Sequence, residues 1–272
     1  MKFYPYGVGN LVTRVIEDGA GDNAMVLVHG AGARCDRWRH NIPVFAKAGY
    51  HVYALDMPGH GFASKGPNFA YGAPGFAGFV ADFIRSLPHK KVILVGTSLG
   101  GHTSATVGYR HPDLIRALIL VGATGLFELG PDVRNAIAVR VKDLTREGIV
   151  GKLNGLVYDG KRLVNDEWVD EEFRVNNSPG AAEAFAKLAD WFRDSVDKDA
   201  IGDKLGKMPN KPPILLIWGV ADRAVPVEVG RKAKTVLGNP PLVEMQEAAH
   251  APYLEKPDEF NKAVLDFVKT IK

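Results

Sequence analysis

A serine flanked by glycines is the first feature of the sequence that could do chemistry. The segment GTSLG at residues 96–100 follows an apolar run at 92–95 and opens a helical pattern that ends near Arg110. In a G-x-S-x-G elbow the serine sits on a sharp turn between a strand and a helix, and the small residues beside it let the two backbones pass closely. The pattern therefore predicts that Ser98 is a nucleophile with an exposed hydroxyl.

A serine hydroxyl needs a base within hydrogen-bond reach, and histidine is the usual one. In this kind of site the chain order is serine, acid, histidine, and three histidines follow the serine: His102, His111 and His250. His102 is confined to the helix that the serine opens, and His111 closes that helix in a His-Pro step. His250 lies in a turn segment after the last expected strand. We therefore predict His250 as the general base.

The acid of such a site should leave a strand end before the histidine, so that its carboxylate holds the imidazole in the right tautomer. Asp222 lies just beyond an apolar run at 214–217, and Pro226 prevents further strand pairing after it. Asp199 and Asp203 are less well placed, because both fall where the helical insertion is expected to end. Asp222 is therefore the predicted third member of the triad.

An acyl-transfer site also needs backbone N–H groups that face the developing oxyanion. Leu99, directly after the serine, supplies one in this prediction. The second is expected from the glycine-rich segment at 29–32, which follows the first central strand, with Ala31 as the donor. His29 in the same segment is interpreted as structural.

Short apolar runs that end at turn residues predict the strands that position these groups. The runs lie at residues 25–28, 52–55, 92–95, 117–121, 214–217 and 242–245. Runs that are apolar on both faces are typical of a parallel sheet, and helical periodicity over 76–87 and 260–271 predicts helices that pack on it. The alternation favours an α/β fold with a mostly parallel central sheet and helices on both faces.

The alternation stops between about residues 125 and 208, where three helical patterns follow one another at 136–144, 167–175 and 181–192. We expect a helical cap at 125–208, inserted into a core made of residues 1–124 and 209–272. Cap side chains are expected to set substrate size, either by facing the site or by packing the cap onto the core; the candidates are Leu153, Phe185, Leu188 and Trp191.

The bulk composition favours a small-molecule substrate. The 272 residues carry a formal net charge of +3, without a block of like charges, so no footprint for nucleic acid or anionic lipid is present. The N-terminal segment contains early charges, proline and glycine, which indicates neither a signal peptide nor a membrane span. We expect a cytoplasmic protein that binds no membrane, and the sequence does not specify its oligomeric state.

No cofactor is expected from the motifs. The sequence lacks the H-E-x-x-H pattern of a zinc helix, and it has one cysteine, Cys35. A phosphate-binding loop and a dinucleotide fingerprint after a strand are also missing. The expected chemistry therefore rests on side chains and backbone alone.

These segments together resemble the α/β-hydrolase superfamily. The resemblance is carried by His29-Gly30 after a strand, the segment DMPGHG at 56–61 after the next, the Ser98 elbow, Asp222 and His250. It covers nearly the whole chain outside the cap, and it implies that the segment at 56–61 is a structural turn. Serine at 98 disfavours the dehalogenase and epoxide hydrolase branches, which resemble this scaffold but use an aspartate nucleophile.

The helical insertion and the C-terminal segment look most like the branch that contains carboxylesterases and meta-cleavage-product hydrolases, which break C–C bonds. That second group usually has asparagine before the nucleophile and tryptophan after the histidine, where this chain has Thr97 and Ala251. Its members also bind their dienoate with a cap arginine, for which Arg174, and after it Arg140, is the candidate here.

Three hypotheses for the function follow from this resemblance. The first is a carboxylesterase that cleaves small to medium esters through an acyl-serine intermediate. The second is a C–C bond hydrolase that acts on meta-cleavage-type vinylogous diketones, and the departures at Thr97 and Ala251 place it second. The third is a ligand-binding receptor on the same fold, which turnover of a short-chain ester would separate from an enzyme.

Overall fold

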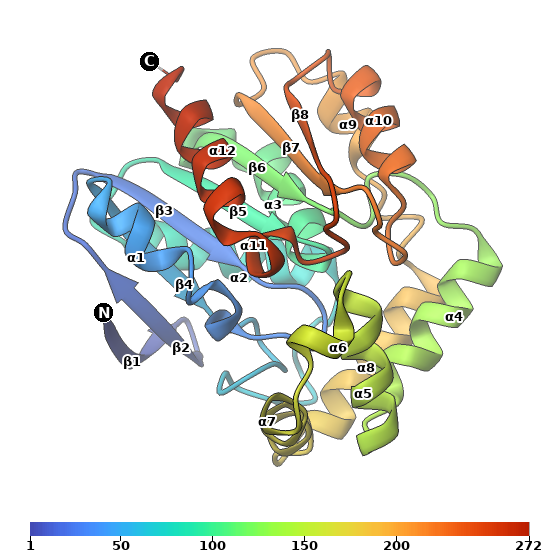
Figure 1. Cartoon of the computed structure of the whole chain (residues 1–272). Helices are drawn as coiled ribbons and strands as arrows, with labels where there is room; N and C mark the ends of the chain where they lie inside the picture. Colours follow the sequence, from blue (N-terminus) through green and yellow to red (C-terminus); the bar gives the residue numbers. More distant parts are fainter. Residues whose placement is uncertain (272) are drawn as a thin grey trace.

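The computed structural model describes residues 1–271, and its centre is an eight-stranded sheet (Figure 1). The strand order is β1-β2-β4-β3-β5-β6-β7-β8, in which β2 is antiparallel to both of its neighbours and β3 to β8 are mutually parallel. The strands are β1 Lys2–Val8, β2 Leu11–Asp18, β3 Asn23–Val28, β4 Tyr50–Leu55, β5 Val92–Thr97, β6 Ile115–Val121, β7 Ile214–Gly219 and β8 Leu242–Met245.

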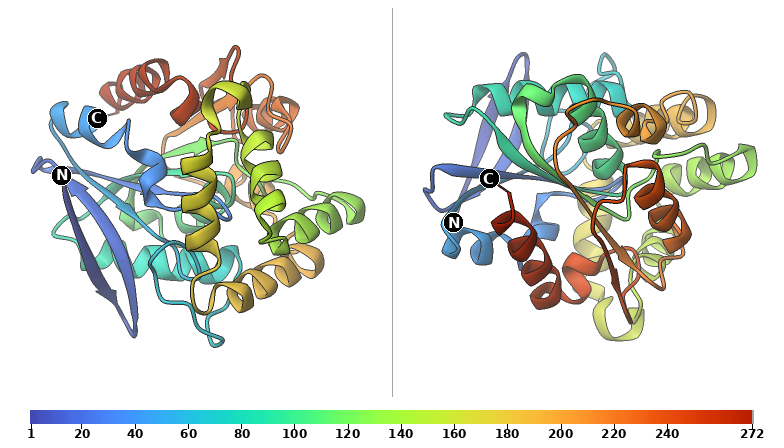
Figure 2. Two further views of the ribbon diagram at one scale, coloured as in Figure 1. Left: turned by 60° about the horizontal axis from the view of Figure 1, so that its bottom comes forward. Right: turned by 90° about the horizontal axis from the view of Figure 1, so that it is seen from above.

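Helices cover both faces of the sheet because its central strands are apolar on both faces. In β3, Met25 and Leu27 pack in the core on one face, while Val26 and Val28 pack on the other. Helices α1 and α12 lie on the first face, and α2, α3 and α10 on the second (Figure 2). The bounds of the core helices are η1 Cys35–Trp38, α1 Ile42–Lys47, α2 Ala73–Ser86, α3 Leu99–Arg110, η2 Pro112–Leu114, α10 Val227–Val236, α11 Pro252–Glu255 and α12 Pro257–Lys269.

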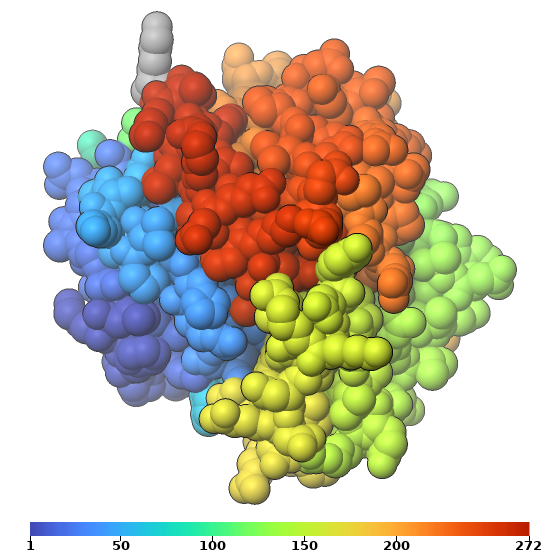
Figure 3. Space-filling model, in the orientation of Figure 1, coloured from blue at the N-terminus to red at the C-terminus, as the bar shows by residue number. Residues whose placement is uncertain are grey.

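Six helices lie between β6 and β7 in the chain; α4 to α8 gather beside the sheet, whereas α9 lies against α3 and α10 (Figures 1 and 3). Among them α4 packs on α8, and α5 packs on α7. Their bounds are α4 Pro131–Lys142, α5 Arg146–Leu156, α6 Gly160–Leu163, α7 Asp166–Asn176, α8 Ala181–Asp194 and α9 Gly202–Gly206. We propose that residues 125–208, which contain all six, form the cap.

The α/β class with a mostly parallel sheet, predicted from the sequence, is confirmed. Each of the six expected strands is present. The hairpin of β1 and β2 was not expected, and neither was α5. Within residues 1–271, no helix combines the length and apolar character that crossing a bilayer requires.

Candidate active site

The loop at the carboxyl end of β5 has the geometry of a strained elbow. Ser98 has φ 55° and ψ −120°, and α3 begins at the next residue. A Cβ on Gly96 would come within 2.2 Å of the Gly100 carbonyl oxygen, and a Cβ on Gly100 would come within 2.4 Å of the carbonyl oxygens of Val28 and His29. Both glycines are therefore required by close backbone approach, and an unfavourable φ at the serine is held by the packing around it.

Asp222 and His250 form a buried pair at the ends of β7 and β8. The His250 Nδ1 lies 2.7 Å from Asp222 Oδ2, so Nδ1 carries a proton and donates it to the carboxylate, which leaves Nε2 as the free ring nitrogen. The other carboxylate oxygen, Oδ1, accepts from the backbone N–H groups of Ala224 at 2.9 Å and Val225 at 2.8 Å. The turn after β7 thus fixes the carboxylate, and the carboxylate fixes the ring.

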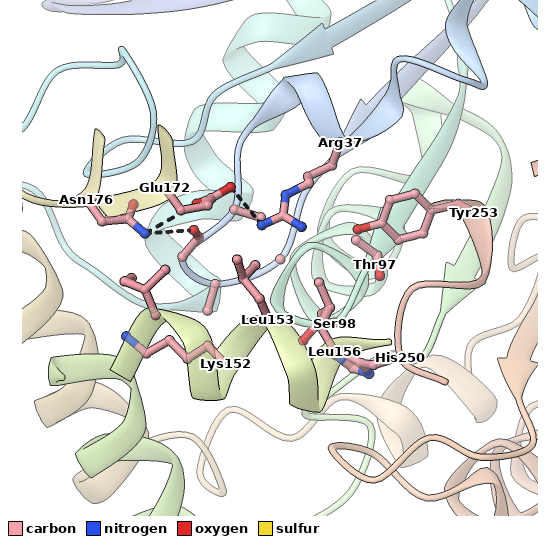
Figure 4. A pocket seen from close by; sticks show the side chains of 15 residues that line it. Arg37, Thr97, Ser98, Lys152, Leu153, Leu156, Glu172, Asn176, His250 and Tyr253 are labelled. Carbon is pink, nitrogen blue, oxygen red and sulfur yellow. Dashed lines mark hydrogen bonds and ion pairs between the residues drawn. The ribbon is translucent and has the colours of Figure 1, made fainter. Parts of the chain in front are cut away.

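Ser98 and His250 line the same cavities, and Figure 4 shows their side chains next to each other. In the part of the chain that the structure describes, no hydrogen bond joins the Ser98 hydroxyl to the His250 ring. Catalytic hydrogen bonds are often long before substrate binds and tighten in the complex. We propose that Ser98, His250 and Asp222 form a triad, since Ser98 and His250 line the same cavities and Asp222 accepts from His250.

Two residues that the sequence analysis did not single out hold this pair in place. Glu255 accepts from the backbone N–H groups on either side of the histidine, those of Ala249 at 2.8 Å and Ala251 at 3.2 Å. Gly122 follows β6 with φ +47°, and a Cβ there would come within 3.2 Å of both Asp222 Oδ2 and His250 Nδ1. The glycine therefore leaves room for the pair, and the glutamate fixes the loop that carries the ring.

The glycine-rich loop after β3 lies against the elbow. A Cβ on Gly30 would come within 3.0 Å of the serine Cβ, and Ala31 lines both cavities that contain Ser98. As the first residue of α3, Leu99 has a backbone N–H without an acceptor inside the helix. His29 has a structural role, because its Nδ1 donates to the Gly30 carbonyl at 2.8 Å and its Nε2 accepts from the Met57 N–H at 2.9 Å.

A cavity of about 80 Å³ lies beside Ser98 (Figure 4), and we call it the polar cavity because it holds the buried pair of Arg37 and Glu172, although Ile149, Leu153 and Leu156 also line it. Its polar lining comes from both the core and the helical insertion: Arg37, Thr97, Lys152, Glu172, Asn176 and Tyr253. Asn176 Nδ2 donates to the Gly32 carbonyl at 3.2 Å, which ties α7 to the loop after β3. Burial lowers the pKa of Lys152 to about 8 and raises the pKa of Tyr253 to about 12.

Arg37 is the buried cation of this cavity, which Lys152 also lines. It is 3% exposed, and its Nη2 donates to Glu172 Oε1 at 2.7 Å. The guanidinium also stacks over the Trp168 ring, 4.5 Å from its centroid. Its Nε and Nη1 are buried and have no hydrogen-bond partner among residues 1–271. A buried N–H without a partner is costly, so Arg37 keeps hydrogen-bonding capacity that Glu172 does not use.

A second cavity, of about 160 Å³, adjoins the first and shares Ser98 and His250 with it. We call it the apolar cavity, because its lining from the helical insertion is largely apolar: Ile137, Val141, Leu156, Phe185 and Phe192. Ser98 and His250 therefore lie where the two cavities meet.

The structure sorts the expected cap residues into two groups. Leu153 lines the polar cavity and Phe185 lines the apolar cavity. Leu188 is fully buried in the core, and Trp191 packs on His102 and donates from Nε1 to Asp199 Oδ2 at 2.7 Å.

Of the two cap arginines expected from the sequence, only Arg140 lines a cavity that contains Ser98. Arg174 is exposed and lines neither cavity, because it lies on the opposite side of α7 from the buried Glu172. Arg140 is exposed at the apolar cavity. The buried cation is Arg37, which the sequence analysis missed because its partner lies 135 residues away. No group of three or more His, Cys, Asp or Glu side chains in residues 1–271 is arranged to hold a metal ion.

Buried histidines around the site make the fold sensitive to acid. Burial lowers the pKa of His60 to about 3 and that of His102 to about 4. The unfolded chain binds protons on these histidines near pH 6.5, whereas the folded chain does not. Their contribution to the free energy of unfolding is therefore fully present above pH 6.5 and decreases as the pH falls below it.

We expect the free energy of unfolding to fall by about 2 kcal/mol per histidine between pH 7 and pH 5. Urea unfolding at pH 8, 7, 6 and 5 measures this loss. In the variant His102→Gln, the free energy of unfolding should fall by about 2 kcal/mol less between pH 7 and pH 5 than in wild type, whatever the stability of the variant at pH 8. A fall equal to that of wild type would contradict the assignment of His102 as a buried neutral group.

The fold and the site together define the class of the protein. A family model described as alpha/beta hydrolase fold matches residues 23–257, and the chain belongs to this family. The protein is therefore a hydrolase of the α/β-hydrolase fold.

The relatives narrow the comparison to particular enzymes. The chain is 31% identical over 265 residues to 2-hydroxy-6-oxo-6-(2'-aminophenyl)hexa-2,4-dienoic acid hydrolase of Metapseudomonas resinovorans. This alignment covers 96% of this chain and 88% of the relative. It is 29% identical to 2-hydroxy-6-oxo-2,4-heptadienoate hydrolase of Pseudomonas putida, over 96% of this chain and 94% of the relative. The crystal structure of the CarC enzyme, a serine hydrolase involved in carbazole degradation, superimposes with a TM-score of 0.86 at 27% identity and covers 99% of both chains.

Proposed function

We propose that the protein cleaves a carbon–carbon bond in 2-hydroxy-6-oxo-2,4-dienoates, the meta-cleavage-type vinylogous diketones. The observation that carries the proposal is the meeting of a polar and an apolar cavity at Ser98 and His250. Such a substrate has a carboxylate and a hydroxyl at one end and an acyl substituent at the other. The two relatives that are dienoate hydrolases support the same class.

The chemistry divides into a proton transfer and a cleavage. The dienol first gains a proton at C5 and loses one from the C2 hydroxyl, which gives a 2,6-diketone. The nucleophile then adds to C6, and the C5–C6 bond breaks. The electron pair of that bond passes through the conjugated chain to the C2 oxygen. A group that favours negative charge on that oxygen therefore stabilises the transition state more than the bound ketone.

The triad carries out the acyl transfer in this proposal. Ser98 attacks C6 while His250 Nε2 takes the hydroxyl proton, and Asp222 stabilises the imidazolium. The N–H groups of Ala31 and Leu99 donate to the oxyanion that forms on C6. Water then attacks the acyl-serine, with the histidine again as base, and releases the carboxylic acid.

Arg37 binds the dienoate end in this proposal. Arg37 lines the cavity that also contains Ser98, and two of its N–H donors, Nε and Nη1, have no partner among residues 1–271. Charge-assisted hydrogen bonds from a guanidinium to a carboxylate or enolate oxygen are among the stronger polar contacts in proteins. The positive charge at this position favours the electron shift to the C2 oxygen.

This proposal reverses the order of the hypotheses drawn from the sequence, which placed ester hydrolysis first. The dienoate hydrolases among the relatives favour C–C cleavage. Ester hydrolysis stays the second candidate because Glu172 balances the charge of Arg37 in the polar cavity, which weakens its pull on an anionic substrate. Both reactions use the same triad and differ in their need for the polar cavity.

Removal of the ion pair should separate the two reactions. In the double variant Arg37→Met/Glu172→Leu, apolar side chains of similar length replace both charges, so the fold should persist. We expect kcat/KM for 2-hydroxy-6-oxo-6-phenylhexa-2,4-dienoate to fall about 100-fold or more, which is about 2.7 kcal/mol of transition-state stabilisation.

The matched measurement is the hydrolysis of p-nitrophenyl acetate by the same variant, which should change less than about threefold. Absorbance decay of the dienolate and release of p-nitrophenolate report the two rates. An equal fall for both substrates would contradict a specific role of the pair in binding the dienoate.

A further inference from the structure

A surface groove runs between α4, α5 and the loop after β7. It has a volume of about 860 Å³. Half of its lining residues are small or apolar: Ala136, Val139, Gly148, Gly151, Gly155 and Ala224. The other half are polar or charged, and two of them, Arg140 and Lys152, carry long aliphatic stems. Helix α4 packs on α8 and α5 packs on α7, so the groove lies where two pairs of packed helices meet.

The groove is continuous with the apolar cavity that contains Ser98. Four residues line both spaces: Arg140, Lys152, Gly155 and Ala224. A group attached to a substrate at the serine would therefore reach the groove past these four residues, two of which have flexible side chains and two of which are small.

Glycines on α5 keep this space open. A Cβ on Gly151 or Gly155 would meet no other atom within 4 Å. At Gly148, by contrast, a Cβ would come within 2.3 Å of the Asp143 carboxyl carbon. Glycine is the least favoured residue inside a helix apart from proline, so two glycines that face open space lower the intrinsic stability of α5 and leave the groove unfilled.

An exposed aliphatic side chain lies on the opposite wall. Val139 on α4 exposes 73% of its surface and lines the groove. The wall formed by α4 thus offers an apolar contact across from the glycines of α5.

We propose that the groove binds the distal part of the substrate's acyl group, and that the acyl group is longer than the apolar cavity alone can hold. The inference rests on the proposed function, in which the acyl carbon is attacked by Ser98. The substrate class it names is a medium-chain alkyl or arylalkyl acyl compound. The polar end of the substrate occupies the cavity of Arg37, so the two ends of the molecule extend from the serine into different cavities.

Phosphonylation of the serine tests this proposal without reference to the native leaving group. With a p-nitrophenyl alkylphosphonate, Ser98 Oγ attacks phosphorus, the bond to p-nitrophenolate breaks, and the hydroxyl proton passes to His250. The probes are a butyl and a dodecyl phosphonate, and the readout is the second-order rate of p-nitrophenolate release.

The test variants are Gly151→Leu, which fills the groove from α5, and Val139→Asn, which removes the apolar contact on α4. We expect Gly151→Leu to lower the rate with the dodecyl probe by at least tenfold and the rate with the butyl probe by less than twofold. Val139→Asn should lower the dodecyl rate about threefold. The matched control is Gly78→Leu, at a glycine of α2 that also faces open space and lies outside the groove; it should change neither rate.

An equal effect of Gly151→Leu on both probes, or none on either, would overturn the groove proposal. If Gly151→Leu does not fold, Val139→Asn decides the question: an unchanged rate with the dodecyl probe in that variant would also overturn the groove proposal. A wild-type protein that reacts with neither probe would instead contradict the role of Ser98, so the two failures are distinguishable.

Discussion

Ser98→Ala should abolish turnover of every substrate of this protein. The serine sits on the strained elbow between β5 and α3 and lines both cavities, so no other hydroxyl can take its place at the scissile carbonyl. His250→Ala should lower kcat on the order of 10⁴-fold or more, because triad members act as a unit. Asp222→Asn should cost less than either, because the ring keeps its place in the site.

The measurement is steady-state turnover of the purified variants, together with intact mass after treatment with a fluorophosphonate. Wild type should gain one covalent adduct and Ser98→Ala none. A near-normal kcat in His250→Ala would show that His250 is not the general base. An adduct that persists in Ser98→Ala would show that Ser98 is not the nucleophile.

The largest loss of stability should come from Glu172→Ala. The glutamate is 2% exposed and accepts from Arg37, which is itself 3% exposed. The substitution leaves the buried guanidinium without its anion, and breaking a buried ion pair in this way costs about 3–5 kcal/mol. For a chain of this size the melting temperature should fall by roughly 10 °C.

Glu171→Ala is the matched control. The neighbouring glutamate lies on the same helix and pairs with Arg34 at 2.7 Å, but its side chain is 57% exposed, so its loss should cost less than about 1 kcal/mol. Arg37→Met/Glu172→Leu should melt close to wild type because no charge is left unpaired. Equal melting temperatures for Glu171→Ala and Glu172→Ala would contradict the importance of the buried pair.

The fold class could be predicted from the sequence because the stretches 92–95 in β5 and 117–121 in β6 are continuously apolar and each is followed by a glycine. The three residues proposed as a triad could also be found, since each follows a parallel strand and the carboxyl ends of such strands meet at one edge of the sheet. Their catalytic roles stay predictions.

The missed features have weak local signals. In β1 and β2, polar and apolar residues alternate irregularly, and Phe3 and Val12 are exposed. Glycines inside α5 weaken its helical pattern. Arg37 stands among other charged residues in the sequence and looks like a surface residue, and only the fold brings it to Glu172 on α7.

Direct comparison of two substrates tests the central claim. The wild-type protein is assayed at one pH with 2-hydroxy-6-oxo-6-phenylhexa-2,4-dienoate and with p-nitrophenyl acetate, and the products of the first reaction are identified as benzoate and 2-hydroxypenta-2,4-dienoate. We predict a kcat/KM for the dienoate at least about tenfold above that for the ester, a difference of about 1.4 kcal/mol in transition-state stabilisation. Rapid ester hydrolysis without formation of benzoate from the dienoate would contradict C–C bond hydrolysis as the function.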